Sequence, residues 1–170
     1  RFFRTSEKVF ESSEPIYYPD DEVTLCLISY YPYQEEGVNM GESTMSVAVE
    51  TDQNLSAGYF CSDFLVASQN LQSAPKGAIA LHYDHKFFKL KIALVGKEGE
   101  ELQGILDADP KLSVCGFYTK AIYDFQKETY SAFSNEKSIT PAGKWEIQGN
   151  RLSGKEVILI PQETTLGYQY

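Results

Sequence analysis

The stretch IALHYDHKFFKLKIALVG at residues 79–96 carries the clearest indication of the fold. In its second half every other side chain is apolar, at Phe88, Leu90, Ile92 and Leu94. Lys89 and Lys91 stand between them. Because successive side chains of a strand point to opposite faces of a sheet, this alternation predicts a half-buried β-strand, and we expect Leu90 on its buried face.

The same period of two recurs along the chain. It is clearest in two sets of residues: Met45, Val47 and Val49, and Ile79, Leu81 and Tyr83. Segments 23–31, 113–119 and 156–161 are apolar on both faces, which is typical of interior strands. Clusters of turn-forming residues separate these runs, and no long segment has helical apolar spacing. We therefore predict an all-β fold, an antiparallel β-sandwich with little helix, formed by residues 1–170 as one domain.

The charge balance is acidic. Asp and Glu number 24 against 15 Lys and Arg, which gives a net charge of -9. Such a chain repels a phosphate backbone, so we predict no nucleic-acid partner. No apolar run approaches the roughly 18 residues that a membrane-spanning helix needs. Because the chain begins with Arg1 rather than Met, we expect a processed or trimmed form.

Both histidines of the chain lie in the quoted stretch and raise the question of a metal site. His82 and His85 are three positions apart, with Asp84 between them. On an extended strand His82 and Asp84 point to one face and His85 to the other. No further ligand cluster elsewhere completes a coordination shell. We therefore predict neither a bound metal nor a cofactor.

Catalytic motifs are equally absent from the sequence. There is no Gly-x-Ser-x-Gly elbow, and a serine triad would need one of the same two histidines. Paired carboxylates occur at 19–22 and 35–37, in turns where solvated loop charges are expected. We predict that the chain is not an enzyme.

The three cysteines have no metal or redox spacing. Cys26, Cys61 and Cys115 lie far apart and have apolar or aromatic neighbours. We expect buried thiols that act as small apolar side chains. One disulfide in an exported protein is the alternative.

Aromatic residues are abundant, with 12 Tyr and 10 Phe against one Trp. We expect most of them to pack in the core or at strand ends. The segment YYPY at residues 30–33 and the loop around Trp145 are the places where exposed rings are expected. Tyr33 and Trp145 are therefore candidates for ligand or adhesive contacts.

Several short segments, in order along the chain, resemble elements of the fimbrillin-like (Mfa-like) proteins of Bacteroides-type bacteria. An acidic turn leads into a hydrophobic strand that ends in Tyr31, Pro32 and Tyr33. Paired TDQ and DxLxA elements are matched by Thr51, Asp52, Gln53, Asp63, Leu65 and Ala67. The family's L-x-F-x-H-x-x-S-K-L strand pair is matched by Leu81, Tyr83, His85, Lys89 and Leu90. Segment 116–121 (GFYTKA) and the end of ILIPQ match as well, the latter through Pro161 and Gln162.

The resemblance implies a sandwich of the transthyretin-like, Greek-key type. It makes His85 a structural residue in the bend between two strands, where it hydrogen-bonds locally or packs. Phe88 stands where the family usually has a small residue, so we expect different packing around His85. Family members usually continue into a second β-sandwich, and residues 162–170 are expected to begin that connection.

The function implied by the resemblance is that of a structural or adhesive subunit of a bacterial surface fimbria. Fimbrillin-like proteins are exported as lipoprotein precursors and anchored at the outer membrane by a lipid. In some members a trypsin-like protease cuts after an Arg near the N-terminus and removes a strand, and a terminal strand of the next subunit fills the groove. Arg1 and Arg4 are candidates for such a cut; the alternative is that they are ordinary residues of an edge strand or arm.

Strand exchange of this kind has a simple physical basis. A missing strand leaves unpaired backbone groups beside an apolar trough, and another chain can satisfy both. Because a head-to-tail contact does not close, it produces filaments. The alternative is a cell-surface module that binds carbohydrate or protein, of host or bacterial origin, without polymerising.

Overall fold

The computed structural model describes residues 2–6, 9–12, 14, 17–18, 23–75, 77–97, 99 and 101–163. The predicted all-β, antiparallel fold is confirmed, with two helices of six residues each among the described residues. No helix in the described ranges is long and apolar enough to cross a membrane. The transthyretin-like, Greek-key connection of the strands stays a prediction.

The chain divides by its internal contacts into two units. The smaller unit comprises Arg1–Ser29 and Ala67–His82, and the larger comprises Tyr30–Val66 and Tyr83–Tyr170. In the smaller unit β1 (Phe2–Ser6) and β2 (Val9–Ser12) form an antiparallel pair. The hydroxyl of Tyr18 donates hydrogen bonds to the Val23 and Leu71 carbonyls of the same unit, at 3.0 and 2.9 Å. Whether residues 1–170 act as one domain stays a prediction.

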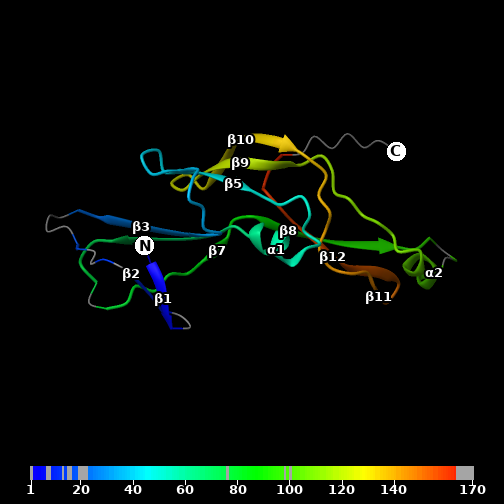
Figure 1. Ribbon diagram of the computed structural model, residues 1–170. Coiled ribbons are helices and arrows are strands. Elements are labelled where there is room, and N and C mark those ends of the chain that lie inside the picture. Colours follow the sequence, from blue (N-terminus) through cyan, green and yellow to red (C-terminus); the bar gives the residue numbers. More distant parts are fainter. Residues whose placement is uncertain are drawn as a thin grey trace. The chain divides into compact units, whose positions relative to one another are not determined.

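One sheet of the larger unit has the order β10-β9-β5-β4 (Figure 1). Its strands are β10 (Thr129–Glu136), β9 (Tyr118–Asp124), β5 (Thr44–Ala48) and β4 (Val38–Asn39). Met45 is opposite Tyr123 and Val47 opposite Ala121, and all four side chains are buried. The alternation at residues 45–49 therefore predicts the buried face of β5 correctly, because its outward residues Ser46 and Ala48 are exposed.

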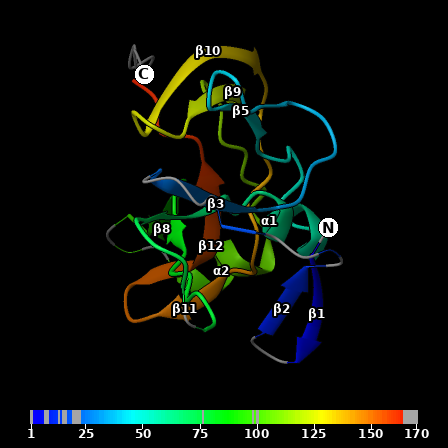
Figure 2. The same ribbon diagram turned by 90° about the vertical axis from the view of Figure 1, so that its left-hand side faces the viewer.

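A second sheet of the larger unit has β12 (Arg151–Leu159) between β11 (Glu146–Gln148) and β8 (Phe88–Val95), as can be followed in Figure 2. The end of β12 is buried on both faces, at Val157, Ile158 and Leu159. This confirms the interior strand predicted for 156–161.

A third sheet has the order β3-β6-β7, from β3 (Leu25–Tyr31), β6 (Leu65–Leu71) and β7 (Asp84–His85). His85 pairs with Leu65 as the last residue of the short strand β7. The bend follows at Phe87, before β8 begins. The predicted bend is therefore displaced by two residues from His85.

Two expected strands are not formed. Of segment 113–119 only Tyr118 and Thr119 belong to a strand, while Val114 makes one isolated bridge to Ile139. Residues 79–83 form no strand either, although their apolar residues alternate. In both places the side chains are mostly exposed or half-buried. The apolar residues there do not pack against a core, so the sequence pattern alone does not produce a strand.

An aromatic cluster fills the core of the larger unit. Its members, linked by ring contacts with centroids 5.1–6.0 Å apart, are Phe64, Phe87, Tyr123, Phe125 and Tyr130. These five rings serve packing, as expected, but the expectation holds for only part of the aromatic residues. The exposed ones include Tyr17, Tyr31, Tyr33, Phe60, Tyr83, Phe88 and Tyr118.

Candidate functional site

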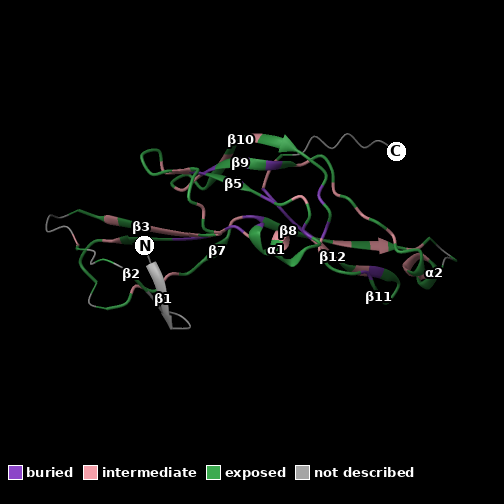
Figure 3. Ribbon diagram, viewed as in Figure 1, coloured by how far each residue is buried: buried purple, intermediate pink, exposed green. Residues whose placement is uncertain are grey.

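Strand β8 is an open edge of its sheet. It pairs with β12 along one side, and no other described strand pairs with the opposite side. None of its eight residues is buried, whereas β12 ends in buried residues (Figure 3). An edge of this kind presents unpaired backbone N–H and C=O groups to any chain that can lie alongside it.

The apolar core ends between these two strands. Phe88 is opposite Leu159, and Leu90 is opposite Val157. Leu159 and Val157 are 0% exposed, while Phe88 is 38% and Leu90 40% exposed. The expectation that Leu90 is buried is therefore wrong, because no described strand lies beyond β8 to cover it. Two large apolar side chains are left half open along the edge.

On the other face of β8, Lys89 makes polar contacts with Glu156 and Tyr59. The Lys89 ammonium lies 3.6 Å from a Glu156 carboxylate oxygen and 5.6 Å from the centre of the Tyr59 ring. The Tyr59 hydroxyl donates a hydrogen bond to the same carboxylate. Burial raises the pKa of Tyr59, with a further contribution from Glu156, so the hydroxyl keeps its proton. Helix α1 (Ser56–Cys61), which carries Tyr59, thus occupies this face.

The far side of β12 is closed by other means. Beyond β11, the backbones of Ala142 and Glu156 exchange two hydrogen bonds of 2.8 and 3.1 Å. Next to them the side-chain amide of Gln53 accepts from the Ile158 N–H and donates to the Ile158 carbonyl, both at 2.8 Å. The amide therefore takes the place of a strand residue, and β12 offers no free edge there.

Gln162 repeats this arrangement at the start of β9. Its Oε1 accepts from the Tyr118 N–H at 2.8 Å, and its Nε2 donates to the Tyr118 carbonyl at 3.0 Å. Pro161 immediately precedes it and is half-buried. Two glutamines singled out by the family resemblance thus satisfy strand backbone with their side chains.

Edge strand β10 carries a bulge itself, whereas in the β8–β12 pair the extra residue lies on β12, between Leu152 and Lys155, and not on the edge strand β8. The pairing of β10 with β9 shifts register between Ser131 and Ser134, and Ala132 and Asn135 have positive φ angles of 50° and 61°. The side-chain amide of Asn135 donates to the hydroxyl oxygen of the buried Thr119 at 2.7 Å, and this hydroxyl donates to the backbone carbonyl of Asn135 at 2.6 Å. Such bulges blunt an edge against pairing. This leaves β8 as the longest regular open edge in the described part of the larger unit.

The histidines do not meet. His85 Nδ1 lies 2.7 Å from an Asp63 carboxylate oxygen, which joins two motif residues of the resemblance. His82 is exposed and belongs to the smaller unit. Asp52 accepts the backbone N–H of Asn54 at 3.1 Å. In the described ranges no group of three or more His, Cys, Asp or Glu side chains is arranged to hold a metal.

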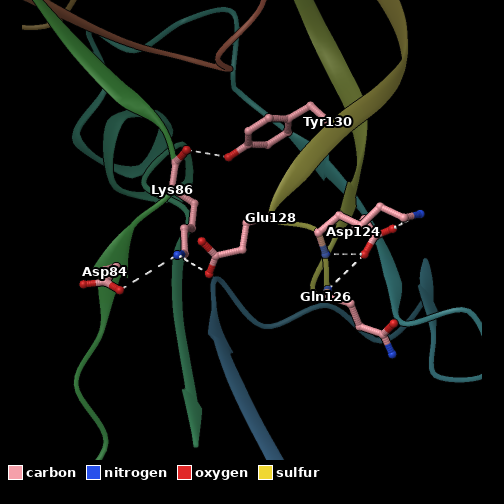
Figure 4. A network of polar contacts seen from close by, with 7 residues as sticks. Asp84, Lys86, Asp124, Gln126, Glu128 and Tyr130 are labelled. Atoms are coloured by element: carbon pink, nitrogen blue, oxygen red, sulfur yellow. Dashed lines mark hydrogen bonds and ion pairs between the residues drawn. The ribbon is translucent and has the colours of Figure 1, made fainter.

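Residues next to His85 form a polar network that sequence reasoning missed (Figure 4). Lys86 lies 2.9 Å from a Glu128 oxygen and 3.8 Å from an Asp84 oxygen, and its carbonyl accepts from the Tyr130 hydroxyl. In the adjoining turn, Asp124 accepts the backbone N–H groups of Gln126 and Lys127 at 2.9 Å each. These bonds, first of all the one from Lys127, lower the pKa of Asp124. The network ties the chain just before β8 to the β9–β10 hairpin.

The two candidate contact aromatics differ in exposure. Tyr33 is 77% exposed, as expected. Trp145 is only 8% exposed, and its indole N–H donates to the Pro110 carbonyl at 2.8 Å. The expectation of an exposed ring at Trp145 is therefore wrong, because the loop around Pro110 covers it. Whether either residue contacts a ligand stays a prediction.

Other predicted features stand as follows. Arg1 and residues 164–170 lie outside the described residues; Arg4 lies in β1 opposite Phe10, with its side chain outside the description.

Cys26, Cys61 and Cys115 are free and exposed, so the expected burial is wrong. Cys26 lies on β3, none of whose residues is buried, and Cys115 lies outside any strand. Neither thiol therefore has a core to enter.

The fold is that of an antiparallel β-sheet protein, in which one side of strand β8 is not paired by any strand of the described residues. The chain belongs to the fimbrillin-like family, whose model matches residues 1–170. This confirms the resemblance seen in the sequence motifs.

Two solved structures share the fold. One is a candidate cell adhesion protein from Bacteroides uniformis, 23% identical, with a TM-score of 0.56 over 93% of this chain and 58% of that one. The other is a candidate cell adhesion protein from Bacteroides ovatus, 14% identical, with a TM-score of 0.54 over 91% of this chain and 56% of that one. The chain thus spans 58% and 56% of the lengths of these proteins. A comparison with curated proteins gives no match.

Proposed function

We propose that the chain is a structural or adhesive subunit of a bacterial surface fimbria, and that it joins other subunits by adding a strand along β8. Membership of the fimbrillin-like family supports the fimbrial role and a place at the cell surface. It also favours a non-enzymatic role. Export as a lipoprotein precursor with a lipid anchor in the outer membrane belongs to the same proposal.

The observation that carries the strand-addition step is the abrupt end of the core at β8. Leu90 is 40% exposed directly beside the fully buried Val157. A strand laid along β8 satisfies its outward backbone groups and covers Leu90 and Phe88 in one step. Because donor and acceptor surfaces differ, each added subunit leaves a new acceptor, and a filament grows.

Processing at Arg1 or Arg4 is the proposed trigger. Residue 4 pairs with Phe10 in the β1–β2 hairpin, so a cut after Arg4 would remove most of one strand of that pair. The donor in this proposal is a terminal strand of the next subunit. Its supporting argument is the family relationship.

The test compares assembly of the full chain with that of two charged variants. Leu90→Arg places a charge on the proposed docking edge. Ile122→Arg is the matched control, because Ile122 is similarly exposed, at 37%, but lies on the inner strand β9. Cleavage after Arg4 is introduced genetically, by expression from Thr5 onward, because an arginine-specific protease would also cut at the arginines that the variants introduce. Each protein is studied in its full and cleaved forms by size-exclusion chromatography with light scattering at rising concentration.

We expect wild type and Ile122→Arg to form concentration-dependent oligomers after cleavage, and Leu90→Arg to remain monomeric. Equal melting temperatures of the two variants establish that folding is intact. Assembly of Leu90→Arg at the wild-type level contradicts docking at β8. A wild-type chain that stays monomeric at every concentration, before and after cleavage, contradicts polymerisation by this chain.

A second candidate function, a surface module that binds carbohydrate or protein without polymerising, is favoured by the exposure of Tyr33. Its ring is 77% exposed, and Tyr31 two residues earlier is 43% exposed. Exposed tyrosines are common in adhesive contacts because they offer a large rigid surface with a polar tip. Loss of a glycan-array signal in Tyr33→Ala supports this candidate, and an unchanged signal excludes Tyr33 from the contact.

A further inference from the structure

A pocket of about 770 Å³ lies in the larger unit, and none of its wall residues belongs to β8. We propose that it binds an anionic saccharide, one that carries carboxylate or sulfate groups. Its walls come from the end of helix α2 (Leu102–Asp107), the loop that follows it, the loop before β11 and one residue of β12. The residues that matter for charge and shape are Asp109, Lys111, Lys144, Trp145 and Lys155. The volume falls within the range of about 300–1,000 Å³ usual for small-ligand sites.

The charge of the pocket opposes that of the chain. Three lysines line it and only one acid, Asp109, within a protein of net charge -9. Asp109 is already engaged in an ion pair with Lys111. Among the described residues neither Lys144 nor Lys155 forms an ion pair or a side-chain hydrogen bond. The hydrogen bond from Lys111 lowers the pKa of Asp109 and Lys155 adds to this effect, but the ion pair of that carboxylate is with Lys111. Three lysines against one acid leave the pocket with an excess of positive charge, which attracts an anion.

The backbone holds these two lysines in fixed places. Lys144 follows Gly143 and Lys155 follows Gly154, and both glycines have positive φ angles, 85° and 104°. A Cβ on Gly143 would overlap the Gly154 carbonyl oxygen, and a Cβ on Gly154 would overlap the Lys144 carbonyl oxygen. Only glycine therefore allows the two segments to touch here. The close contact places the two lysines on a rigid base, which reduces the ordering cost of binding.

The remaining walls suit a sugar. Leu112 supplies apolar surface, and Trp145, which is only 8% exposed, adds a small part of its ring. The side chains of Asn54, Ser113 and Thr140 can exchange hydrogen bonds with hydroxyl groups. The indole N–H is already used by Pro110, so the ring acts as a wall. An extended acidic peptide cannot bind here by strand addition, which needs a free strand edge. Here the backbone of β12 is taken up by β8, β11 and Ala142.

Calorimetric titration with defined oligosaccharides tests the inference. The probes are tetragalacturonate, which carries carboxylates, and a heparin-derived tetrasaccharide, which carries sulfates. Neutral maltotetraose and the acidic peptide hexaglutamate are the control ligands. The variant Lys144→Gln/Lys155→Gln removes both free charges. Lys120→Gln/Lys137→Gln removes two charges from exposed positions outside this pocket and is the matched control.

We expect at least one anionic probe to bind, maltotetraose not to bind, and affinity to fall at least tenfold in the pocket variant but not in the control. Lys144→Arg keeps the charge and should keep the affinity, which provides a second test if the double variant folds poorly. The inference is overturned if neither anionic probe binds, if maltotetraose or hexaglutamate binds as tightly, or if the control loses as much affinity. None of these outcomes depends on whether the chain polymerises, so the assembly experiment stands apart from this one.

Discussion

The side chain of Gln53 bonds both backbone groups of Ile158, a residue 105 positions further along the chain. Both bonds measure 2.8 Å, and the Gln53 side chain is fully buried. Its backbone N–H also donates to the Thr140 carbonyl at 3.0 Å. Gln53, the last residue of the TDQ motif, thus links the segment before α1 to the edge of β12.

Replacement of Gln53 should be severe. Gln53→Ala leaves the N–H and the carbonyl of Ile158 buried without these partners, and each such group costs about 1–3 kcal/mol. We therefore expect the free energy of unfolding to fall by about 3 kcal/mol or more. Gln53→Glu should be at least as damaging, because a carboxylate cannot donate to the Ile158 carbonyl. Urea-induced unfolding measures both.

Gln148→Ala is the control for this prediction, since Gln148 is exposed on β11. It should change stability by no more than about 0.5 kcal/mol. A loss below about 1 kcal/mol in Gln53→Ala would show that water or a backbone shift replaces the amide.

The neighbouring rings of Tyr123 and Tyr130 allow a matched comparison of two hydroxyl groups. Their centroids are 5.1 Å apart in the aromatic cluster. The Tyr130 hydroxyl donates to the Lys86 carbonyl, whereas the buried Tyr123 hydroxyl has no hydrogen-bond partner among the described residues. Tyr130→Phe should cost about 1–2 kcal/mol, and Tyr123→Phe should be neutral or stabilising. Equal losses in thermal or urea unfolding would contradict the difference in partners.

Stability should also fall in alkaline solution. Burial raises the pKa of Tyr123 to about 12, and burial likewise raises the pKa of Tyr130. Because the unfolded chain ionises its tyrosines near pH 10, the folded state binds these protons more tightly. The contribution is fully present below pH 10 and is lost as pH rises toward about 12. Tyr123→Phe should flatten this part of the profile of unfolding free energy against pH. An unchanged slope would mean that other groups dominate it.

The sequence predicts strands well where a core face exists. Met45 and Val47 alternate with exposed residues because one face of β5 packs inward, and residues 157–160 of the doubly apolar run at 156–161 are buried. The same signals mislead at Val114, which makes an isolated bridge to Ile139 but lies in no strand, and at Leu81, which also lies in no strand. The local alternation of apolar residues indicates which side chains can be buried. Whether they are buried depends on strands and loops that are distant in the sequence.

The candidate site shows the same limit. The alternation of apolar residues around Leu90 predicts a buried side chain. Leu90 is exposed because β8 is an edge strand, and the position of a strand within its sheet cannot be deduced from periodicity. Gln53 and Gln162 can be found by motif comparison, but their pairing with Ile158 and Tyr118 cannot, since amide side chains leave no periodic signal. The lysines of the pocket lie 33 and 11 positions apart along the chain, from Lys111 to Lys144 and from Lys144 to Lys155, and only the folded loops bring them together.

Chelation of metal ions should leave stability unchanged. His85 is engaged with Asp63 at 2.7 Å, and His82 lies outside the unit that contains this pair. We expect the same melting temperature with and without EDTA, and His85→Ala should cost no more than about 1 kcal/mol because the pair is exposed. A melting temperature that falls in EDTA and is restored by zinc would show a metal site formed with residues outside this description.

Two leucines at different depths of the same sheet should respond very differently to truncation. Leu159 is 0% exposed in β12, and Leu90 is 40% exposed on the edge strand β8. Leu159→Ala removes core contacts and leaves a cavity, which costs about 2–5 kcal/mol. Leu90→Ala removes a side chain already partly in water, so its cost should be about 1 kcal/mol. In an assembled filament a donor strand covers Leu90, and Leu90→Ala should then approach Leu159→Ala in cost. Urea unfolding of the monomer and of the assembled form measures both. If Leu90→Ala costs as much as Leu159→Ala in the monomer, the edge of β8 is already covered, and strand addition there is excluded.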